Sequence, residues 1–398
     1  MRLIRGGTVF VNGELARLDI AFDEDGIHEL APQIDVDAED VIDASGHIIL
    51  PGIVDAHVHI RDFNESRKET WLTAGQAALA GGVTAVLAMP NTDPPITTVE
   101  MIREQRRRAQ ATPIDYGLFA GISPDKLSEV PRLARERGII GFKLYMGETT
   151  GGLVIGDPKT QREAFKRVAD TELVLAVHAQ RLGSSSEAAD LETALEHAVQ
   201  TGTKLHLCHV RTQAGVELAD EARDDGIDVT IETCPHYLVF SADDVRQKGP
   251  RLKVNPPLAT PEDRDFLWHA LADGIIDIVA SDHAPHTLHE KGPPFGQAPF
   301  GLPGLETTMP ILLDGVSRHR LSLGRLVECV SSKPADRFDL PHHGTIAEDR
   351  PARLTIVDPQ SQRQFSDAVV RSRCGWTPYD GLSFQGQIAN TVVAGAYA

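Results

Sequence analysis

The chain of 398 residues carries 39 lysine and arginine residues against 57 aspartate and glutamate residues, a formal net charge of −18. This acidic balance argues against binding to nucleic acid or to an anionic membrane surface, because both depend on basic side chains. Hydrophobic residues make up 41% and charged residues 24% of the chain, as is usual for globular proteins. No apolar run reaches the ~18 residues of a transmembrane helix, and the N-terminus lacks the apolar core of a signal peptide.

The 4 cysteines stand far apart, and no pair has the spacing of a zinc ribbon. We therefore expect free thiols and a cytoplasmic protein, since disulfides persist mainly in oxidising compartments. Histidine is more informative: there are 16 histidines against 5 tyrosines and 3 tryptophans, and the histidines fall in tight groups. Such groups are typical of metal-binding enzymes, although a few surface histidines would also raise the count.

The two ends of the chain resemble each other in pattern. Residues 1–47 read as short β-strands separated by Gly and Asp turns, and residues 345–398 contain similar segments. We expect these two ends to form one small β-sandwich domain. Residues 48–344, in which the pattern changes, form the second predicted domain.

Within this second domain, strand-like segments alternate with helix-like segments. We expect eight strands, at residues 53–60, 83–89, 114–121, 140–146, 173–179, 204–210, 228–234 and 276–282. Helices are predicted at residues 99–109, where Thr97 and Glu100 form a capping box, and at residues 261–272. Eight β/α units of this length predict a TIM-like (β/α)8 barrel. Residues 287–305 are rich in Pro and Gly and predict a functional loop.

The first of these strands carries regularly spaced polar residues. Because strand side chains alternate between two faces, Asp55, His57, His59 and Arg61 share one face, and the apolar residues that alternate with them share the other. We expect the polar face to point into the barrel and the apolar face to pack on helices. Two histidines at this spacing can bind one metal, although buried, hydrogen-bonded histidines give the same pattern.

More ligand-type residues lie at the ends of later strands, where barrel enzymes have their active sites. Lys143 is set among apolar residues, where a charge is costly, and an amine that had reacted with CO2 would be an anionic ligand. Taken alone, the residue favours a snorkelling or ion-paired lysine instead. His178 ends the fifth strand, and Asp282, which can bind metal and transfer protons, ends the eighth. In the sixth strand, His209 lies nearer the C-terminal end, so we choose it as the ligand and regard His206 as structural.

Together these strand ends supply nitrogen and oxygen ligands without cysteine. Such a set suits zinc, with manganese, iron or cobalt as alternatives. The predicted metal ligands are His57, His59, Lys143, His178, His209 and Asp282.

Motifs across nearly the whole chain resemble the amidohydrolase superfamily and, within it, the cyclic amidohydrolases. They are DAHVHIRD (55–62), MPNTDPP (89–95), GFKLYMG (141–147), VHAQ (177–180), CHVRT (208–212), KVNPPL (253–258), SDHAPH (281–286), PPFGQAPFGLPGLET (293–307) and CGWTPYDG (374–381). The nearest match is the dihydroorotase family. That resemblance implies reversible hydrolysis of L-dihydroorotate to N-carbamoyl-L-aspartate, a step of pyrimidine biosynthesis.

The resemblance also implies roles for matched residues. It implies two zinc ions per subunit, with the four strand-end histidines as ligands and Lys143 carboxylated as a bridging ligand. Asp282 resembles the catalytic aspartate, which would carry a proton from water to the leaving nitrogen. The implied substrate-binding residues are Arg61, Asn91, Asn255 and His286.

Some segments differ from the common dihydroorotase pattern. Residues 62–64 read DFN where many dihydroorotases have EPG, and ETCPHYL at residues 232–238 resembles allantoinase. Allantoinase and hydantoinase (dihydropyrimidinase) therefore stay as alternatives. A catalytically silent partner of a carbamoyltransferase is a further alternative, although such partners usually lose ligands. We expect a homodimer that acts on a small molecule.

Overall fold

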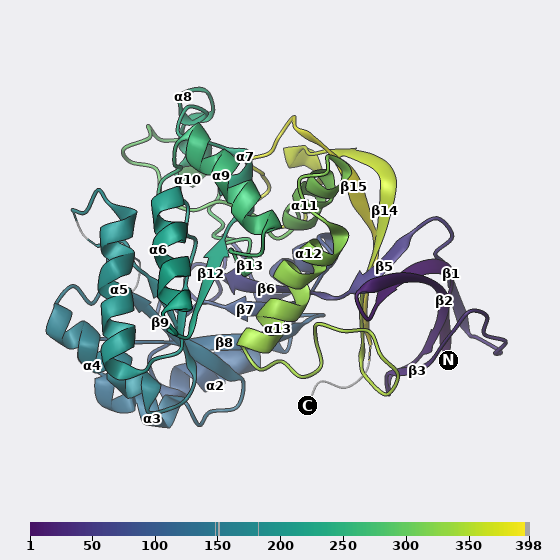
Figure 1. The fold of residues 1–398 in the computed structure, drawn as a ribbon, viewed down its shortest axis with the longest axis horizontal. Helices are drawn as coiled ribbons and strands as arrows, with labels where there is room; N and C mark the ends of the chain where they lie inside the picture. The colour runs from purple at the N-terminus through teal and green to yellow at the C-terminus, as the bar shows by residue number, and fades with distance from the viewer. Residues whose placement is uncertain (148, 150–151, 182, 395–398) are drawn as a thin grey trace.

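The computed structural model describes residues 1–147, 149, 152–181 and 183–394, and it contains the predicted barrel. Its parallel sheet of 8 strands runs in chain order, from β6 to β13. The strands are β6 (Ile53–Val58), β7 (Val83–Ala88), β8 (Asp115–Gly121), β9 (Ile139–Tyr145), β10 (Val174–His178), β11 (Leu205–Leu207), β12 (Val229–Thr233) and β13 (Ile278–Val279). The first and last strands meet where Val58 pairs with His283, which closes the barrel (Figure 1).

Helices cover the outside of the barrel (Figure 1). They are α1 (Trp71–Ala80), α2 (Val99–Ala109), α3 (Val130–Leu133), α4 (Pro158–Ala169), α5 (Glu187–Thr201), α6 (Gln213–Asp224), α7 (Pro235–Val239), α8 (Val245–Lys248), α9 (Pro261–Ala272), α10 (Leu288–Lys291), α11 (Thr308–Ser317), α12 (Leu323–Val327) and α13 (Lys333–Arg337). Among the described residues, none of these helices is long and apolar enough to cross a membrane.

Two of these helices were predicted with their bounds. Helix α9 begins and ends at the predicted residues, after the N-cap Thr260. Helix α2 also has the predicted bounds, but its N-cap is Thr98, whose side chain accepts a hydrogen bond from the Met101 N–H. The predicted capping box with Thr97 was therefore wrong by one position, because two adjacent threonines offer the same hydroxyl to the helix.

A second sheet is built from both ends of the chain, as predicted. Its strand order is β15-β14-β5-β1-β2-β3, with β4 beside β1. The strands are β1 (Arg2–Val11), β2 (Glu14–Phe22), β3 (Ile27–Ala31), β4 (Asp40–Asp43), β5 (Ile48–Pro51), β14 (Ala352–Gln364) and β15 (Ser383–Ala394). In Figure 1 the purple N-terminal strands lie beside the yellow C-terminal strands. Strand β5 joins these two groups, since it pairs with both β1 and β14.

The inside of the barrel is filled by a buried apolar cluster. Val54, Ala85, Phe119 and Ile278 come from different strands and belong to this one cluster. Towards the N-terminal ends of the strands, Phe338 packs edge-on against Phe119 with 5.4 Å between ring centroids. The centre of the barrel is therefore a packed core and not a pore.

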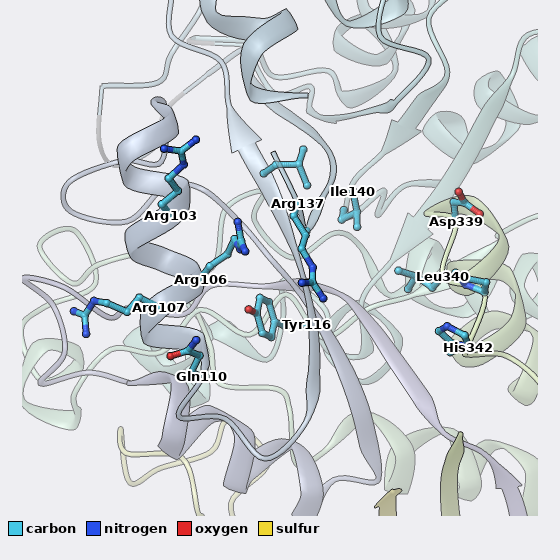
Figure 2. Close-up of a pocket in the computed structure, with 13 residues that line it drawn as sticks. Arg103, Arg106, Arg107, Gln110, Tyr116, Arg137, Ile140, Asp339, Leu340 and His342 are labelled. Atoms are coloured by element: carbon cyan, nitrogen blue, oxygen red, sulfur yellow. The ribbon is translucent and has the colours of Figure 1, made fainter. Parts of the chain in front are cut away.

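A separate hollow of about 750 Å³ lies at the N-terminal ends of β8 and β9. Figure 2 shows Tyr116 at its centre, between the arginines of α2 and Arg137. Two of these arginines are exposed and bind glutamates through two hydrogen bonds each: Arg103 binds Glu136 and Arg107 binds Glu104.

Candidate active site

Strand β6 and the residues that follow it direct His57 and His59 to a cavity at the C-terminal end of the barrel, but not by the simple alternation that we predicted. Val54 and Ala56 belong to the cluster inside the barrel, whereas Val58 packs in the outer layer. The reversal coincides with a register shift between Asp55 and Val58 in the pairing with β7. An extra residue in one strand changes which side chains face inward. The prediction that the apolar residues share one outward face was therefore wrong.

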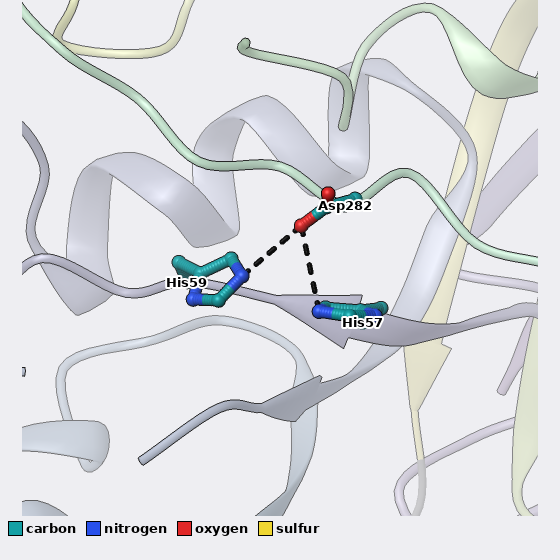
Figure 3. A group of neighbouring side chains, drawn as sticks. All are labelled: His57, His59 and Asp282. Carbon is teal, nitrogen blue, oxygen red and sulfur yellow. Dashed lines mark hydrogen bonds and ion pairs between the residues drawn. The ribbon is translucent and has the colours of Figure 1, made fainter. Parts of the chain in front are cut away.

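Three predicted ligands converge at this end of the barrel (Figure 3). Asp282 Oδ1 lies 3.0 Å from His59 Nε2 and 3.4 Å from His57 Nε2. Candidate ligand atoms of these three residues all lie within 4.8 Å of one another, and all three side chains are buried. Two nitrogens and a carboxylate at this spacing can bind one divalent metal ion.

The other two predicted histidine ligands lie beside this group. His178 Nδ1 is 3.0 Å from His209 Nε2, and the ring centroids of His209 and His57 are 5.4 Å apart. His178 Nε2 is buried and has no hydrogen-bond partner among the described residues. The backbones of His209 and Asp282 have φ values of 44° and 45°. Positive φ is unusual outside glycine and occurs often at functional sites.

Lys143 lies below the cavity, at the end of β9, and is 0% exposed. Its Nζ donates to Cys208 Sγ over 2.8 Å. No carboxylate lies within ion-pair distance of this lysine in the described part of the chain. A snorkelling lysine would expose its amine, which this buried residue does not, and an ion-paired lysine has no carboxylate partner among the described residues. A buried ammonium among histidines is costly, whereas an anionic carbamate on the same nitrogen could be stabilised by bound divalent metal.

The electrostatics of the cluster keep most of its imidazoles neutral, which is the form that binds metal. Burial lowers the pKa of His59 to about 4. Burial and then the Lys143 charge lower the pKa of His178 to about 3. Burial, followed by His178 and then Lys143, holds the pKa of His209 well below its usual value. For His57, burial and Lys143 also oppose protonation, but Glu232 and Asp282 outweigh them and raise its pKa to about 10.

Glu232 is the main functional residue that the sequence analysis missed. Its Oε1 is 2.8 Å from His57 Nδ1 and accepts the His209 N–H over 3.0 Å, while its Oε2 is 3.0 Å from His206 Nε2. Glu232 therefore orients one predicted ligand and the backbone of another, as carboxylates behind metal ligands commonly do. The available signal was a carboxylate near the end of the mostly buried strand β12, in the ETCPHYL segment.

The predicted substrate-binding residues line the same cavity, whose volume is about 230 Å³. All predicted site residues line it except Lys143. Arg61 is 5% exposed, and its Nε has no hydrogen-bond partner among the described residues. Asn255 and loop residues 299–301 also line the cavity, and their two segments lie side by side, since the Gly301 N–H donates to the Lys253 carbonyl.

Asn91 and His286 also make hydrogen bonds with other residues that line the cavity. Asn91 Oδ1 is 2.6 Å from His59 Nδ1, so this side chain orients a predicted ligand. His286 Nε2 donates to the Phe300 carbonyl oxygen over 2.8 Å, while its Nδ1 is buried without a hydrogen-bond partner in the described part of the chain. Burial, followed by the charge of Arg61, lowers the pKa of His286 to about 2. The predicted substrate wall is thus continuous with the predicted metal ligands.

The donor set fits a divalent metal centre. Buried imidazole nitrogens and a carboxylate face one another, and the orphaned His178 Nε2 shows that the protein itself does not satisfy every donor. Cys208 and His236, which we did not predict, lie within the same spacing of His57 and Asp282 respectively. The arrangement can bind metal and hold a small polar ligand beside the buried guanidinium of Arg61.

Comparison with known proteins agrees with this geometry. The model of the amidohydrolase family matches residues 48–397. A dihydroorotase from Halobacterium salinarum is 35% identical, covering 96% of this chain and 92% of that protein. A dihydroorotase from Pediococcus pentosaceus is 32% identical, covering 99% and 97%.

Solved structures point to the same family. The L-hydantoinase (dihydropyrimidinase) from Arthrobacter aurescens superposes with a TM-score of 0.92 at 30% identity, covering 98% of this chain and 94% of that one. The resemblance to cyclic amidohydrolases is confirmed, and this family implies dependence on a divalent metal. The chain therefore belongs to the amidohydrolase family, and its full-length curated relatives include dihydroorotases.

Proposed function

We propose that this chain is a dihydroorotase, which reversibly hydrolyses the cyclic amide of L-dihydroorotate to N-carbamoyl-L-aspartate. The observation that carries the proposal is the buried guanidinium of Arg61 in the same cavity as the His57, His59 and Asp282 cluster. Arg61 has no carboxylate partner within ion-pair distance among the described residues. A buried arginine of this kind favours a substrate that brings its own carboxylate. Dihydroorotate carries one, whereas allantoin, hydantoin and dihydrouracil do not.

We further propose two zinc ions per subunit and a carbamate on Lys143. The ligands would be the histidines at positions 57, 59, 178 and 209, with Asp282 and the carboxylated lysine. The burial of Lys143 without an anionic partner in the described residues supports the carbamate. The metals would polarise the amide carbonyl and lower the pKa of the attacking water towards neutrality.

In this proposal, Asp282 moves the proton. Burial opposes ionisation of Asp282, but His57 and His59 hold its pKa below the usual range, so the side chain is an ionised carboxylate with a free position for a proton. Water adds its oxygen to the carbonyl carbon, the ring C–N bond breaks, and Asp282 delivers the proton to the leaving nitrogen. Glu232 holds the His57 ring in place through Nδ1.

Arg61, Asn91 and His286 would bind the substrate carboxylate, and Asn255 would contact the ring. The unpartnered atoms on this wall support these roles, since Arg61 Nε and His286 Nδ1 are buried without hydrogen bonds among the described residues. A bound carboxylate favours the protonated imidazole of His286, which then donates from Nδ1. The backbone of residues 299–301 would close the pocket over the ring.

The second candidate is a hydantoinase, favoured by the high TM-score with the Arthrobacter L-hydantoinase. Allantoinase is favoured only by the ETCPHYL segment. A silent partner of a carbamoyltransferase is disfavoured, because every predicted metal ligand is present at the strand ends.

One experiment separates these candidates. The metal-replete protein is assayed side by side with L-dihydroorotate, allantoin, dihydrouracil and hydantoin, and kcat/KM is measured for each. We expect L-dihydroorotate to be preferred by orders of magnitude, and Arg61→Met to abolish that preference. A better rate with allantoin or hydantoin would overturn the proposal, and no activity with any of the four would favour the silent partner.

We also propose a cytoplasmic homodimer. The 4 cysteines are all free and buried, which fits a reducing compartment. The dimer rests on the general frequency of twofold homo-oligomers, and light scattering of the purified protein tests it.

A further inference from the structure

Lys291, at the end of the short helix α10, is a buried cation that the proposed reaction does not use. It is 3% exposed, and no carboxylate lies within ion-pair distance among the described residues. Its Nζ instead donates to the carbonyl oxygens of Lys253, Pro299 and Gly301, over 3.1, 2.9 and 3.0 Å. An ammonium has three N–H donors, so all three are directed at backbone.

These carbonyls belong to two segments that are far apart in sequence and form one wall of the catalytic cavity. Lys253 precedes Val254 and Asn255, which line the cavity, and Pro299 and Gly301 line it from the other segment. The Gly301 N–H also donates to the Lys253 carbonyl over 3.0 Å. A single ammonium therefore joins both segments at the point where they meet.

The loop segment that Lys291 holds also contacts His286. The Phe300 carbonyl, between the two anchored residues, accepts the hydrogen bond from His286 Nε2. The indole N–H of Trp376 donates to the His286 carbonyl over 2.7 Å, and the Lys291 Nζ lies 5.7 Å from the centre of a Trp376 ring. The CGWTPYDG motif thus supports this wall of the cavity through Trp376.

Anchoring the carbonyls also fixes the direction of the amide groups. In a planar trans peptide, C=O and N–H point in opposite directions. With the Pro299 carbonyl held on Lys291, the Phe300 N–H points away from the lysine, and it makes no hydrogen bond within the described residues. Rotation of this peptide unit would turn that donor away from its present direction, and the Phe300 carbonyl in the next peptide unit, which His286 contacts, lies between the two anchored carbonyls of Pro299 and Gly301.

We propose that Lys291 is a positioning residue for substrate recognition: it holds residues 253–255 and 299–301 together so that Asn255, His286 and the loop backbone face the substrate as one surface. This inference rests on the proposed function of the cavity. Lys291 does not touch the metal ligands, so its role concerns binding of the organic substrate and not the metal centre.

The test compares Lys291→Met, which keeps side-chain length and removes the donors, with the wild-type holoenzyme. We expect KM for L-dihydroorotate to rise about tenfold or more, since one charged donor to three acceptors is lost, while kcat falls less than about threefold. Metal content is expected to stay at the wild-type level. Lys291→Arg, which keeps the charge and several donors, is expected to fold and to show a smaller rise in KM.

Lys248→Met is the matched control. Lys248 Nζ donates to the Pro378 carbonyl over 3.2 Å and lies 5.5 Å from the Phe240 ring centre, away from the cavity. We expect its KM to be unchanged.

A purely structural role for Lys291 would lower the active fraction, and thus kcat, without changing KM. An unchanged KM in both Lys291 variants would overturn this inference alone. If wild type fails to hydrolyse dihydroorotate, the proposed function falls instead. In that case the same KM comparison on the substrate that is hydrolysed still tests Lys291.

Discussion

The two ends of the barrel both carry a hollow surrounded by charged side chains, but the charges are arranged in opposite ways. At the N-terminal end of the strands, the hollow is about 750 Å³ and its arginines are at the surface (Figure 2). At the C-terminal end, the cavity is only about 230 Å³, and its histidines and aspartate are buried in contact with one another.

The side chains that line the two hollows separate these ends further: among the described residues, none that lines the N-terminal hollow has a buried polar atom without a hydrogen-bond partner. At the N-terminal end, buried Asp115 is bound by Arg353 and His343. At the C-terminal end, His178 Nε2, Arg61 Nε and other polar atoms have no partner among the described residues. An unsatisfied buried polar atom is destabilising, so a cluster of them indicates a binding function. Cavity volume alone would have selected the wrong end.

The largest expected effect is at the C-terminal end. Asp282→Asn removes the proposed proton carrier but keeps the shape of the side chain, so kcat should fall by about 10³-fold or more. The melting temperature and circular dichroism spectrum should stay close to those of wild type. Near-wild-type turnover in the metal-replete variant would refute the proton-transfer role.

Glu232→Gln should have the next largest effect. The amide can still hydrogen-bond His57 but removes the negative charge behind it, so we expect activity or metal affinity to fall by about 10- to 100-fold. Metal titration followed by assay measures both quantities. His206, which shares Glu232, supplies the control: His206→Gln is expected to cost less, since that ring lies outside the cavity lining.

At the N-terminal end, Asp115→Asn should reduce stability and leave activity intact. Asp115 at the start of β8 binds Arg353 of β14 and so connects the barrel to the terminal sheet. Breaking a buried ion pair typically costs about 3 kcal/mol. Chemical denaturation at pH 7 measures this loss, and an unchanged free energy of unfolding would contradict it.

The ion pair between Asp115 and Arg353 also predicts that the stability of the fold depends on pH. Burial opposes ionisation, but His343 and Arg353 hold the pKa of Asp115 below its usual 3.8. The folded protein therefore releases this proton more readily than the unfolded chain. The stability from the charge is complete above about pH 4 and is lost as the pH falls through the folded pKa. The difference between wild type and variant should shrink on acidification.

The smallest effect is expected in the arginine-lined hollow. Arg106→Ala and Arg137→Ala together should leave kcat/KM within about twofold, because Arg106 is only half-buried, Arg137 is exposed, and substitutions at such sites away from the chemistry usually matter little. A large loss of activity would contradict the view that the chemistry is confined to the C-terminal end of the barrel.

Much of this site could be predicted from the sequence, because barrel strands place their C-terminal residues around one opening. His57, His178 and Asp282 were located by that rule. The shift in β6 could not be predicted, since an extra residue in a strand leaves no trace in the alternation of polar and apolar residues. Glu232 was missed because its importance comes from partners 175 and 26 positions away in sequence.

The dual contact of Asn91 was missed for a similar reason. The MPNTDPP motif indicated that Asn91 contacts the substrate, but the Asn91 side chain also orients His59. This second contact depends on how the ends of β6 and β7 lie in space. The positioning of the loop by Lys291 likewise depends on backbone carbonyls, which every residue has and no motif distinguishes.

The central claim is that the C-terminal end of the barrel holds a two-metal hydrolytic centre. Anomalous diffraction at the zinc absorption edge, from crystals of the metal-replete protein, tests it most directly. We predict two peaks among His57, His59, His178, His209 and Asp282, with density for a carboxylate on Lys143 between them. Absence of peaks there, or a metal bound only in the arginine-lined hollow, would contradict the account.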